Sequence, residues 1–233
     1  MYVTAASMKK KIVTILLVAM NLGIYLLVNV LVIIPWYQLA QYNDYILNPN
    51  TGGFYRIFTA MLVHADLLHL LSNMFALLIF GMLVENKYSI LQYLLIYFVS
   101  GFIGNVVSLF LIPLNVFSLG ASGCIFGVMG AYYVSFTAYD KRMILYAIGS
   151  SAIMVALSIG ADINSWAHLL GAVGGLLLGF LFTQYNKKKQ QKNPQIQLKN
   201  SKYDDPDEDE RYHYDPGFYS KKNKDNEEEI DDY

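Results

Sequence analysis

The chain has 233 residues, of which 55% are hydrophobic and only 15% are charged, and its formal net charge is −1. This composition is too apolar for an ordinary soluble domain and is typical of a membrane protein. The single cysteine, Cys124, excludes an internal disulfide and a cysteine-based metal cluster, and it is most simply a small packing residue. The sequence has no glycine-rich phosphate loop or nucleic-acid signature, so we expect no cofactor and no nucleic-acid partner.

Six apolar runs follow one another along the chain, and each has about the length that spans a bilayer, roughly 17 to 25 residues. The first run is too long for a signal peptide and lacks a small-residue cleavage site, so we expect it to be retained as a helix. The fourth and fifth are short, which indicates helices that end below the membrane surface. The predicted fold class is all-α, a polytopic membrane protein with a bundle of six transmembrane helices. The runs are 12–34, 67–84, 90–112, 121–138, 143–160 and 166–185.

Lysine and arginine are unevenly distributed between the two sides that six spans would create. With the N-terminus inside, ten of the eleven Lys and Arg residues up to position 192 fall on the cytoplasmic side, and only Arg56 falls outside. Because cytoplasmic loops are enriched in these residues, we expect both termini to be cytoplasmic.

The composition changes abruptly near the C-terminus. Residues 193–233 carry a net charge of −7, whereas residues 1–192 carry +6. A polar, acidic segment without an apolar period cannot bury a core, so we expect it to be disordered. It is either a solvated tail or a docking peptide whose partner is unknown. The predicted organisation is a cytoplasmic N-terminus at 1–11, a six-span domain at 12–187 and a disordered acidic cytoplasmic tail at 188–233.

Few polar side chains interrupt the spans, and polar groups in lipid tend to mark function because they are costly to bury. The second span carries HADLLHLLSNM, with His64 near its start and with His69 and Asn73 four residues apart on one helix face. The fourth begins with GASG, which contains Ser122, and the sixth carries His168 in SWAHLLGAVGGLLLG.

Three of these polar residues are predicted to lie at one level in the membrane. Each lies 18 or 19 residues from the charged residue at the cytoplasmic end of its own helix. That spacing corresponds to roughly 27 to 29 Å along a helix. Since the three helices run in the same direction, one hydroxyl and two imidazoles could meet in the outer part of the bilayer. The pairs are Ser122 with Asp140, His168 with Lys187, and His69 with Lys87.

A serine hydroxyl needs a base to become a nucleophile, and His168 is the candidate because imidazole titrates near neutral pH. No carboxylate of the sequence lies at that level on a span, so Ser122 and His168 would form a dyad and not a triad. Phe126, one helical turn after the serine, could pack against the histidine. His69 and Asn73 would donate to the oxyanion, together with backbone N–H groups at the helix start.

Other interpretations compete for the same residues. GASG alone also suits close helix packing, and His64, five residues from His69, is more simply an interfacial or loop-bracing group. A zinc site from these two histidines and His168 is conceivable, but neither HExxH nor another ligand cluster accompanies them, so we expect no metal. The sixth span also carries overlapping GxxxG patterns, which predict close packing on another helix, at Gly171, Gly175 and Gly179.

The combination of six spans, HADLLHLLSNM, GASG and AHLLGAVGG resembles the rhomboid family of intramembrane serine proteases over about residues 10–187. The resemblance implies that Ser122 is the nucleophile and His168 its base. It also implies that His69 and Asn73 line the oxyanion site. Relatives often have a tyrosine that stacks on the catalytic histidine, and Phe126 keeps the ring there without the hydroxyl.

A Trp–Arg pair in a membrane-lying first loop is another feature of that family. This chain has Tyr55 and Arg56 in GGFYRIFTAMLVH, so the arginine is kept and the aromatic residue is changed.

The resemblance also implies a function. We expect a serine endopeptidase of a bacterial cytoplasmic membrane that cuts single-span membrane proteins near the extracellular face. The bacterial assignment rests on the compact six-span form and on the lack of a seventh span and of a transit peptide. One alternative is a non-catalytic binder or chaperone of transmembrane helices, against which Ser122 with both His69 and His168 argues. A small transporter is another alternative. It would need inverted repeats or broken helices that carry several charges, and the sequence has neither.

Overall fold

The computed structural model describes residues 12–48, 50–137, 142–157 and 164–192. The chain divides into two compact units, residues 1–185 and 186–233. The acidic segment at 193–233 lies outside the described residues, so its disorder stays a prediction.

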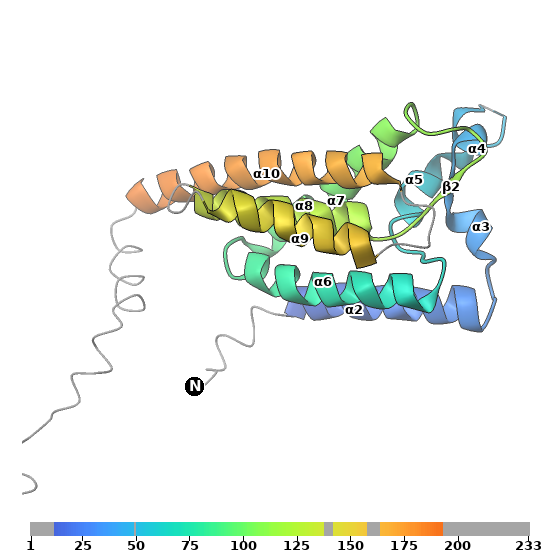
Figure 1. The fold of residues 1–233 in the computed structure, drawn as a ribbon, viewed down its shortest axis with the longest axis horizontal. Coiled ribbons are helices and arrows are strands. Elements are labelled where there is room, and N and C mark those ends of the chain that lie inside the picture. The colour runs from blue at the N-terminus through green and yellow to red at the C-terminus, as the bar shows by residue number, and fades with distance from the viewer. Residues whose placement is uncertain (1–11, 49, 138–141, 158–163, 193–233) are drawn as a thin grey trace, which may run out of the picture. The chain divides into compact units, whose positions relative to one another are not determined.

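Six apolar helices run side by side through the described part of the first unit (Figure 1). Four of them are long and apolar enough to cross a membrane, and α8 is apolar but shorter. The chain therefore has the helices of a polytopic membrane protein. They are α2 (Ile12–Tyr25), which continues as the π-helix η1 (Leu26–Val30), α6 (Leu67–Glu85), α7 (Ile90–Ser108), α8 (Ser122–Thr137), α9 (Met143–Leu157) and α10 (Ser165–Lys192).

Three helix ends differ from the predicted boundaries. The run at 12–34 is helical only to Val30 and the run at 90–112 only to Ser108. In both cases a proline follows five residues later. Proline lacks the N–H that a helix needs, clashes with the carbonyl four residues earlier and disfavours the helical conformation of the residue before it, so neither helix can continue through this point. By contrast, α10 continues to Lys192. Residues 188–192 are thus helical and do not belong to a disordered tail, because lysine and glutamine are good helix formers.

The most enclosed helix is α8. Every residue from Ala121 to Ala131 is buried, and α6, α7 and α9 all pack against this helix. A helix that is apolar on all sides is either a membrane span or surrounded by protein, and the burial of α8 shows that protein surrounds it. Although α8 is short for a membrane span, it lies in the centre of the bundle, where other helices enclose it.

The end of α6 holds the beginning of α2. The buried Glu85 carboxylate accepts hydrogen bonds from the backbone N–H groups of Val13 and Thr14 at 2.9 and 3.1 Å, and from the Thr14 hydroxyl at 2.6 Å. It satisfies N–H groups that have no partner inside the helix and places a negative charge at the positive end of the helix dipole. The first helix is thereby fixed against α6.

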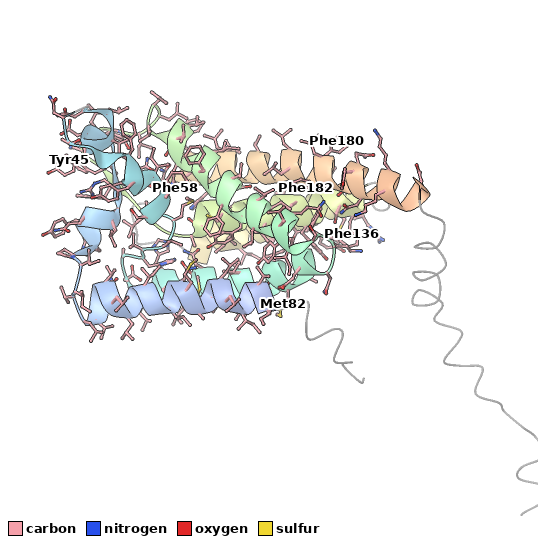
Figure 2. All side chains as sticks on the ribbon, turned by 180° about the vertical axis from the view of Figure 1, so that it is seen from behind. Tyr45, Phe58, Met82, Phe136, Phe180 and Phe182 are labelled. Atoms are coloured by element: carbon pink, nitrogen blue, oxygen red, sulfur yellow. The ribbon has the colours of Figure 1, made fainter. Side chains whose placement is uncertain are left out.

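Between α2 and α6 the chain folds into short elements that gather at one end of the long helices (Figure 1). Figure 2 shows Tyr45 and Phe58 at this end, whereas Met82 and Phe136 lie toward the other. The elements are α3 (Trp36–Leu39), β1 (Gln41–Tyr42), α4 (Asn43–Leu47), the 3-10 helix η2 (Gly53–Tyr55) and α5 (Arg56–Thr59).

Arg56 and Tyr55 hold this connection together. The Arg56 guanidinium donates to the carbonyl groups of Tyr37 and Ala40 at 2.5 and 3.0 Å, and it lies 5.1 Å from the centre of the Tyr45 ring. The Tyr55 hydroxyl donates to the backbone of the same segment. Both members of the Tyr–Arg pair therefore donate hydrogen bonds to backbone carbonyl groups of residues 37–40, which stabilises the segment between α2 and α6.

A two-stranded antiparallel sheet links this connection to the entrance of α8. Strand β1 pairs with β2 (Phe117–Ser118), with Gln41 opposite Ser118 and Tyr42 opposite Phe117. Because β2 ends shortly before GASG, the sheet supports the segment that carries Ser122.

Candidate active site

Ser122 is the first residue of α8, and the backbone turns sharply before it. Gly120 has a φ of +120°, a conformation that side chains disfavour. A Cβ atom at this position would also lie 2.8 Å from the His69 ring. The Gly120 N–H donates to the carbonyl of Ala60 at 2.8 Å. Glycine is thus required at position 120 by both conformation and space, and the turn sets the serine at a helix N-terminus.

His168 lies in the first turn of α10. Its backbone N–H donates to the carbonyl of Asn164 at 3.3 Å. The His168 Nε2 atom lies 2.7 Å from Ser122 Oγ, and the two residues are only 8% and 6% exposed. The structure therefore brings these two predicted residues into hydrogen-bond contact.

Small residues allow α8 and α10 to approach so closely. A Cβ atom added at Gly171 would lie 2.2 Å from the carbonyl oxygen of Gly123, and one at Gly175 would lie 1.8 Å from that of Gly127. Backbones that touch in this way leave no room for a side chain. The predicted packing of the GxxxG patterns on another helix is confirmed, and the partner is α8.

The imidazole of His168 is oriented by ring packing. Phe126 stacks on it, with ring centroids 4.6 Å apart and an interplanar angle of 18°. In the described part of the chain, the His168 Nδ1 atom has no hydrogen-bond partner. Orientation of the ring there comes from Phe126 and Ser122, and not from a carboxylate.

His69 and Asn73 face the same turn from α6. Asp66 caps this helix, and its side chain accepts a hydrogen bond from the His69 N–H at 2.8 Å. A Cβ atom at Gly120 would lie 2.8 Å from His69 Nε2 and 3.6 Å from Asn73 Nδ2. Asn73 is fully buried, and its amide has no hydrogen-bond partner among the described residues. Because an unpaired buried amide is costly, this donor is available to a group that enters the site.

His64 lies in the turn before α6, outside the helix. Its Nε2 atom accepts a 3.5 Å contact from the Ala121 N–H, and its carbonyl accepts from the Asn29 side chain at 3.1 Å. Burial, with the nearby His69 as a smaller cause, lowers the pKa of His64 to about 3, so the ring is neutral at neutral pH. These contacts agree with the loop-bracing interpretation.

A metal site would need at least three suitable side chains. Within the described ranges, no three His, Cys, Asp or Glu side chains gather closely enough to hold a metal ion. The zinc alternative therefore has no ligand set in that part of the chain.

Two residues at the site were not among those predicted from the sequence. The Asn164 side chain caps α10, and it also donates to the Ser118 hydroxyl at 2.9 Å. The only sequence signal for this contact is an asparagine at the N-cap position before an apolar run.

The chain matches the rhomboid domain over residues 51–185, which is more than half of its length. The chain belongs to the rhomboid family. The matched range contains all five predicted site residues, and the rhomboid membership together with the long apolar helices makes the chain a multi-pass membrane protein. The five residues are Ser122, His168, His69, Asn73 and Phe126.

Curated relatives of the chain come from bacteria and plants. It is 30% identical to the putative rhomboid protease YdcA of Bacillus subtilis over 166 residues, which cover 67% of this chain and 83% of that protein. It is 35% identical to RHOMBOID-like protein 6, mitochondrial, of Arabidopsis thaliana over 151 residues, 63% of this chain and 45% of that protein. It is 34% identical to the Rhomboid protease GluP of Bacillus subtilis over 131 residues, which cover 53% of this chain and 25% of that protein. The chain thus spans less than half the length of the Arabidopsis relative.

Proposed function

We propose that this rhomboid family protein is an intramembrane serine endopeptidase. The observation that carries the proposal is the 2.7 Å separation of Ser122 Oγ and His168 Nε2 at the starts of two helices in contact. A serine hydroxyl within hydrogen-bond distance of an imidazole can be activated as a nucleophile. Kinship with proteins named as rhomboid proteases supports the same class of reaction.

In the proposed reaction, Ser122 Oγ attacks the carbonyl carbon of a peptide bond while His168 Nε2 accepts the hydroxyl proton. The carbonyl oxygen becomes negatively charged, and Asn73, His69 and the N–H groups at the start of α8 donate to it. Collapse breaks the C–N bond, and His168 gives its proton to the leaving amine. An acyl ester remains on Ser122. A water molecule, deprotonated by His168, then hydrolyses the ester and restores the serine hydroxyl.

We also propose six spans with both termini in the cytoplasm. Four helices have the required length, and α8 and α9 would be the two short spans. Such a short α8 would place Ser122 below the outer surface, where water can enter from outside. We propose a bacterial cell membrane as the location, in which case the two Bacillus subtilis proteins and not the Arabidopsis relatives would be the guide.

The proposed substrates are single-span membrane proteins that are cut near the extracellular end of the span. A peptide bond in a regular helix is already hydrogen-bonded, and lipid offers no replacement partners, so Ser122 could attack only an unwound segment. In a helix, glycine costs about 1 kcal/mol and proline about 3 relative to alanine. We therefore expect one of these two residues just inside the membrane from the cut, and a small residue at the cut, beside Gly120 and Ala121.

The nucleophile is tested by treating the detergent-purified protein with a fluorophosphonate. We expect one covalent adduct, at Ser122. Ser122→Ala and His168→Ala should each reduce cleavage of a single-span substrate to background, because the two groups act as a unit. Normal cleavage by either variant would exclude the dyad.

Two further measurements test the oxyanion site and the substrate. Asn73→Ala should lower the rate by up to about 10²–10³-fold with little change in fold, since it removes one donor. Replacing the helix-breaking Gly or Pro of a cleaved substrate by Leu should slow cleavage several-fold. Equal cleavage of uninterrupted leucine-rich helices would exclude the unwinding step.

A further inference from the structure

A second polar contact joins the same two segments that carry Ser122 and His168. The Asn164 Nδ2 atom donates to Ser118 Oγ at 2.9 Å. Ser118 lies four residues before Ser122, and Asn164 lies four residues before His168. The two contacts therefore connect the two segments with the same spacing of four residues on each side.

Asn164 uses both ends of its side-chain amide. Its Oδ1 atom accepts from the Ala167 N–H at 3.0 Å, which caps α10, while its Nδ2 atom reaches Ser118. Ser118 is buried and belongs to β2, where it pairs with Gln41 of β1. The start of the helix that carries His168 is thus fastened to a strand.

The position of His168 depends on such a support. Its Nδ1 atom has no partner within the described residues, so the position of the ring depends on Phe126, on Ser122 and on the backbone that carries it. The glycine contacts, Gly123 with Gly171 and Gly127 with Gly175, hold α8 and α10 together on the C-terminal side of the dyad. On the N-terminal side, the first turn of α10 has N–H groups without helical partners and would fray without a tie.

We propose that Asn164 and Ser118 form a clasp that positions His168 against Ser122. The clasp rests on the proposed function, and Asn164 is a positioning residue that touches neither substrate nor reacting atoms. Displacing a reacting group by about 1 Å can cost about 10²-fold in rate. Loss of the clasp should therefore reduce the rate of the chemical step without affecting the binding of substrate.

Three variants separate the clasp from the helix cap. Ser118→Ala removes the acceptor and leaves the cap of α10 intact. Asn164→Ser keeps an N-cap oxygen but is too short to reach Ser118. Asn164→Asp keeps the cap, and its carboxylate can accept a hydrogen bond from the Ser118 hydroxyl. As the matched control, Ser89→Ala removes the side-chain cap of α7, which accepts from the Gln92 N–H at 3.3 Å.

We expect Ser118→Ala and Asn164→Ser each to lower kcat about tenfold with KM unchanged, for a displacement smaller than 1 Å. The double variant should be no slower than either single variant, because both remove the same contact. Asn164→Asp should recover most of kcat, whereas Ser89→Ala should lower the melting temperature without changing kcat. Wild-type kcat in either single variant, multiplied losses in the double variant, or no recovery by Asn164→Asp would each overturn the clasp.

A spectroscopic measurement tests the clasp without cleavage. The chain has four histidines, so imidazole ¹⁵N resonances can be resolved and that of His168 assigned by His168→Gln. Ser118→Ala should shift the Nε2 resonance of His168 toward that of an imidazole without a hydrogen bond, and Ser89→Ala should leave it in place. An unmoved resonance would contradict the clasp.

The two proposals fail in different ways. A wild-type protein that neither cleaves a substrate nor reacts with a fluorophosphonate, but whose His168 resonance moves in Ser118→Ala, would overturn the protease and leave the clasp standing. An active wild-type protein with unchanged rates and resonance in the Ser118 and Asn164 variants would overturn the clasp alone.

Discussion

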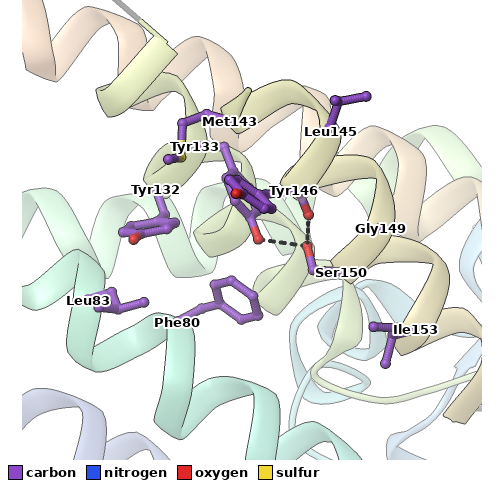
Figure 3. Close-up of a pocket in the computed structure, with 10 residues that line it drawn as sticks. All are labelled: Phe80, Leu83, Tyr132, Tyr133, Met143, Leu145, Tyr146, Gly149, Ser150 and Ile153. Carbon is purple, nitrogen blue, oxygen red and sulfur yellow. Dashed lines mark hydrogen bonds between the residues drawn. The ribbon is translucent and has the colours of Figure 1, made fainter. Parts of the chain in front are cut away.

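The two flanks of α8 pack in opposite ways. Toward α10, the backbones touch at glycine positions where no Cβ atom would fit. Toward α9, side chains from α6, α8 and α9 line an open groove of about 580 Å³ (Figure 3). Its lining is largely aromatic and aliphatic, and it includes Gly149, where an added Cβ atom would meet nothing within 4 Å.

This difference matches what each flank has to do. The proposed dyad requires two atoms on different helices to stay within hydrogen-bond distance, and close-packed contacts resist small displacements. The α9 flank carries no residue of the proposed dyad, so it can tolerate an open groove where the helices pack less closely. The closest packing of α8 is thus against α10, the helix that carries the other residue of the proposed dyad.

The largest expected effect comes from Gly175→Ala on the tight flank. The new Cβ atom would lie 1.8 Å from the carbonyl oxygen of Gly127, so α8 and α10 must separate. Overpacking of this kind costs about 1–3 kcal/mol, and a shift of about 1 Å in the reacting atoms costs about 10²-fold in rate. Single-turnover cleavage and thermal unfolding in detergent measure both effects. A wild-type rate would show that the α8–α10 contact does not set the geometry of the dyad.

A loss of stability without a new steric clash between α8 and α10 is expected for Tyr88→Phe on the same flank. The Tyr88 hydroxyl lies 3.0 Å from the carbonyl oxygen of Ala131 on α8 and 3.2 Å from that of Gly179 on α10. It also lies 3.0 Å from the Thr183 hydroxyl. Removing a buried partner costs about 1–3 kcal/mol. Denaturant unfolding should show this loss. An unchanged free energy of unfolding would mean that the hydrogen bonds of Tyr88 do not stabilise the packing of α8 and α10.

Tyr133→Phe makes the same chemical change on the loose flank and should cost less. The Tyr133 hydroxyl lies 2.7 Å from the Ser150 hydroxyl, and Ser150 also donates to the carbonyl of Tyr146 at 2.7 Å. Because Ser150 keeps that partner, we expect a loss of about 0.5–1.5 kcal/mol, the net value of one hydrogen bond. The unfolding assay used for Tyr88→Phe gives the comparison, and a larger loss for Tyr133→Phe would reverse the ranking of the two flanks.

The smallest effect is expected for Gly149→Ala, the counterpart of Gly175→Ala. An added Cβ atom at position 149 meets nothing within 4 Å, and alanine favours a helix over glycine by up to about 1 kcal/mol. The free energy of unfolding should stay constant or rise slightly, and the cleavage rate should not change. Destabilisation similar to that of Gly175→Ala would show that the flank toward α9 is also closely packed.

The sequence by itself determined the helices and the identities of the candidate site residues. Long apolar runs predict helices because lipid leaves the backbone no other partners. The described long helices follow those runs, except that two end several residues before a proline and α10 continues to Lys192. Four-residue spacing sets His69 and Asn73 on one face of α6, and the motifs around Ser122 and His168 resemble those of the rhomboid family independently of any contact between helices. These are local properties of one segment or of one motif.

Only the tertiary structure decided how these segments meet. It showed that α10 packs on α8, that Ser122 and His168 lie 2.7 Å apart, and that Asn164 reaches Ser118 across 46 positions of sequence. A local pattern cannot predict such contacts, since Asn164 has the same sequence signature as any asparagine that caps a helix. Distance along one helix follows from its constant rise, whereas contact between helices depends on which faces pack and how closely the residues between them allow the backbones to approach.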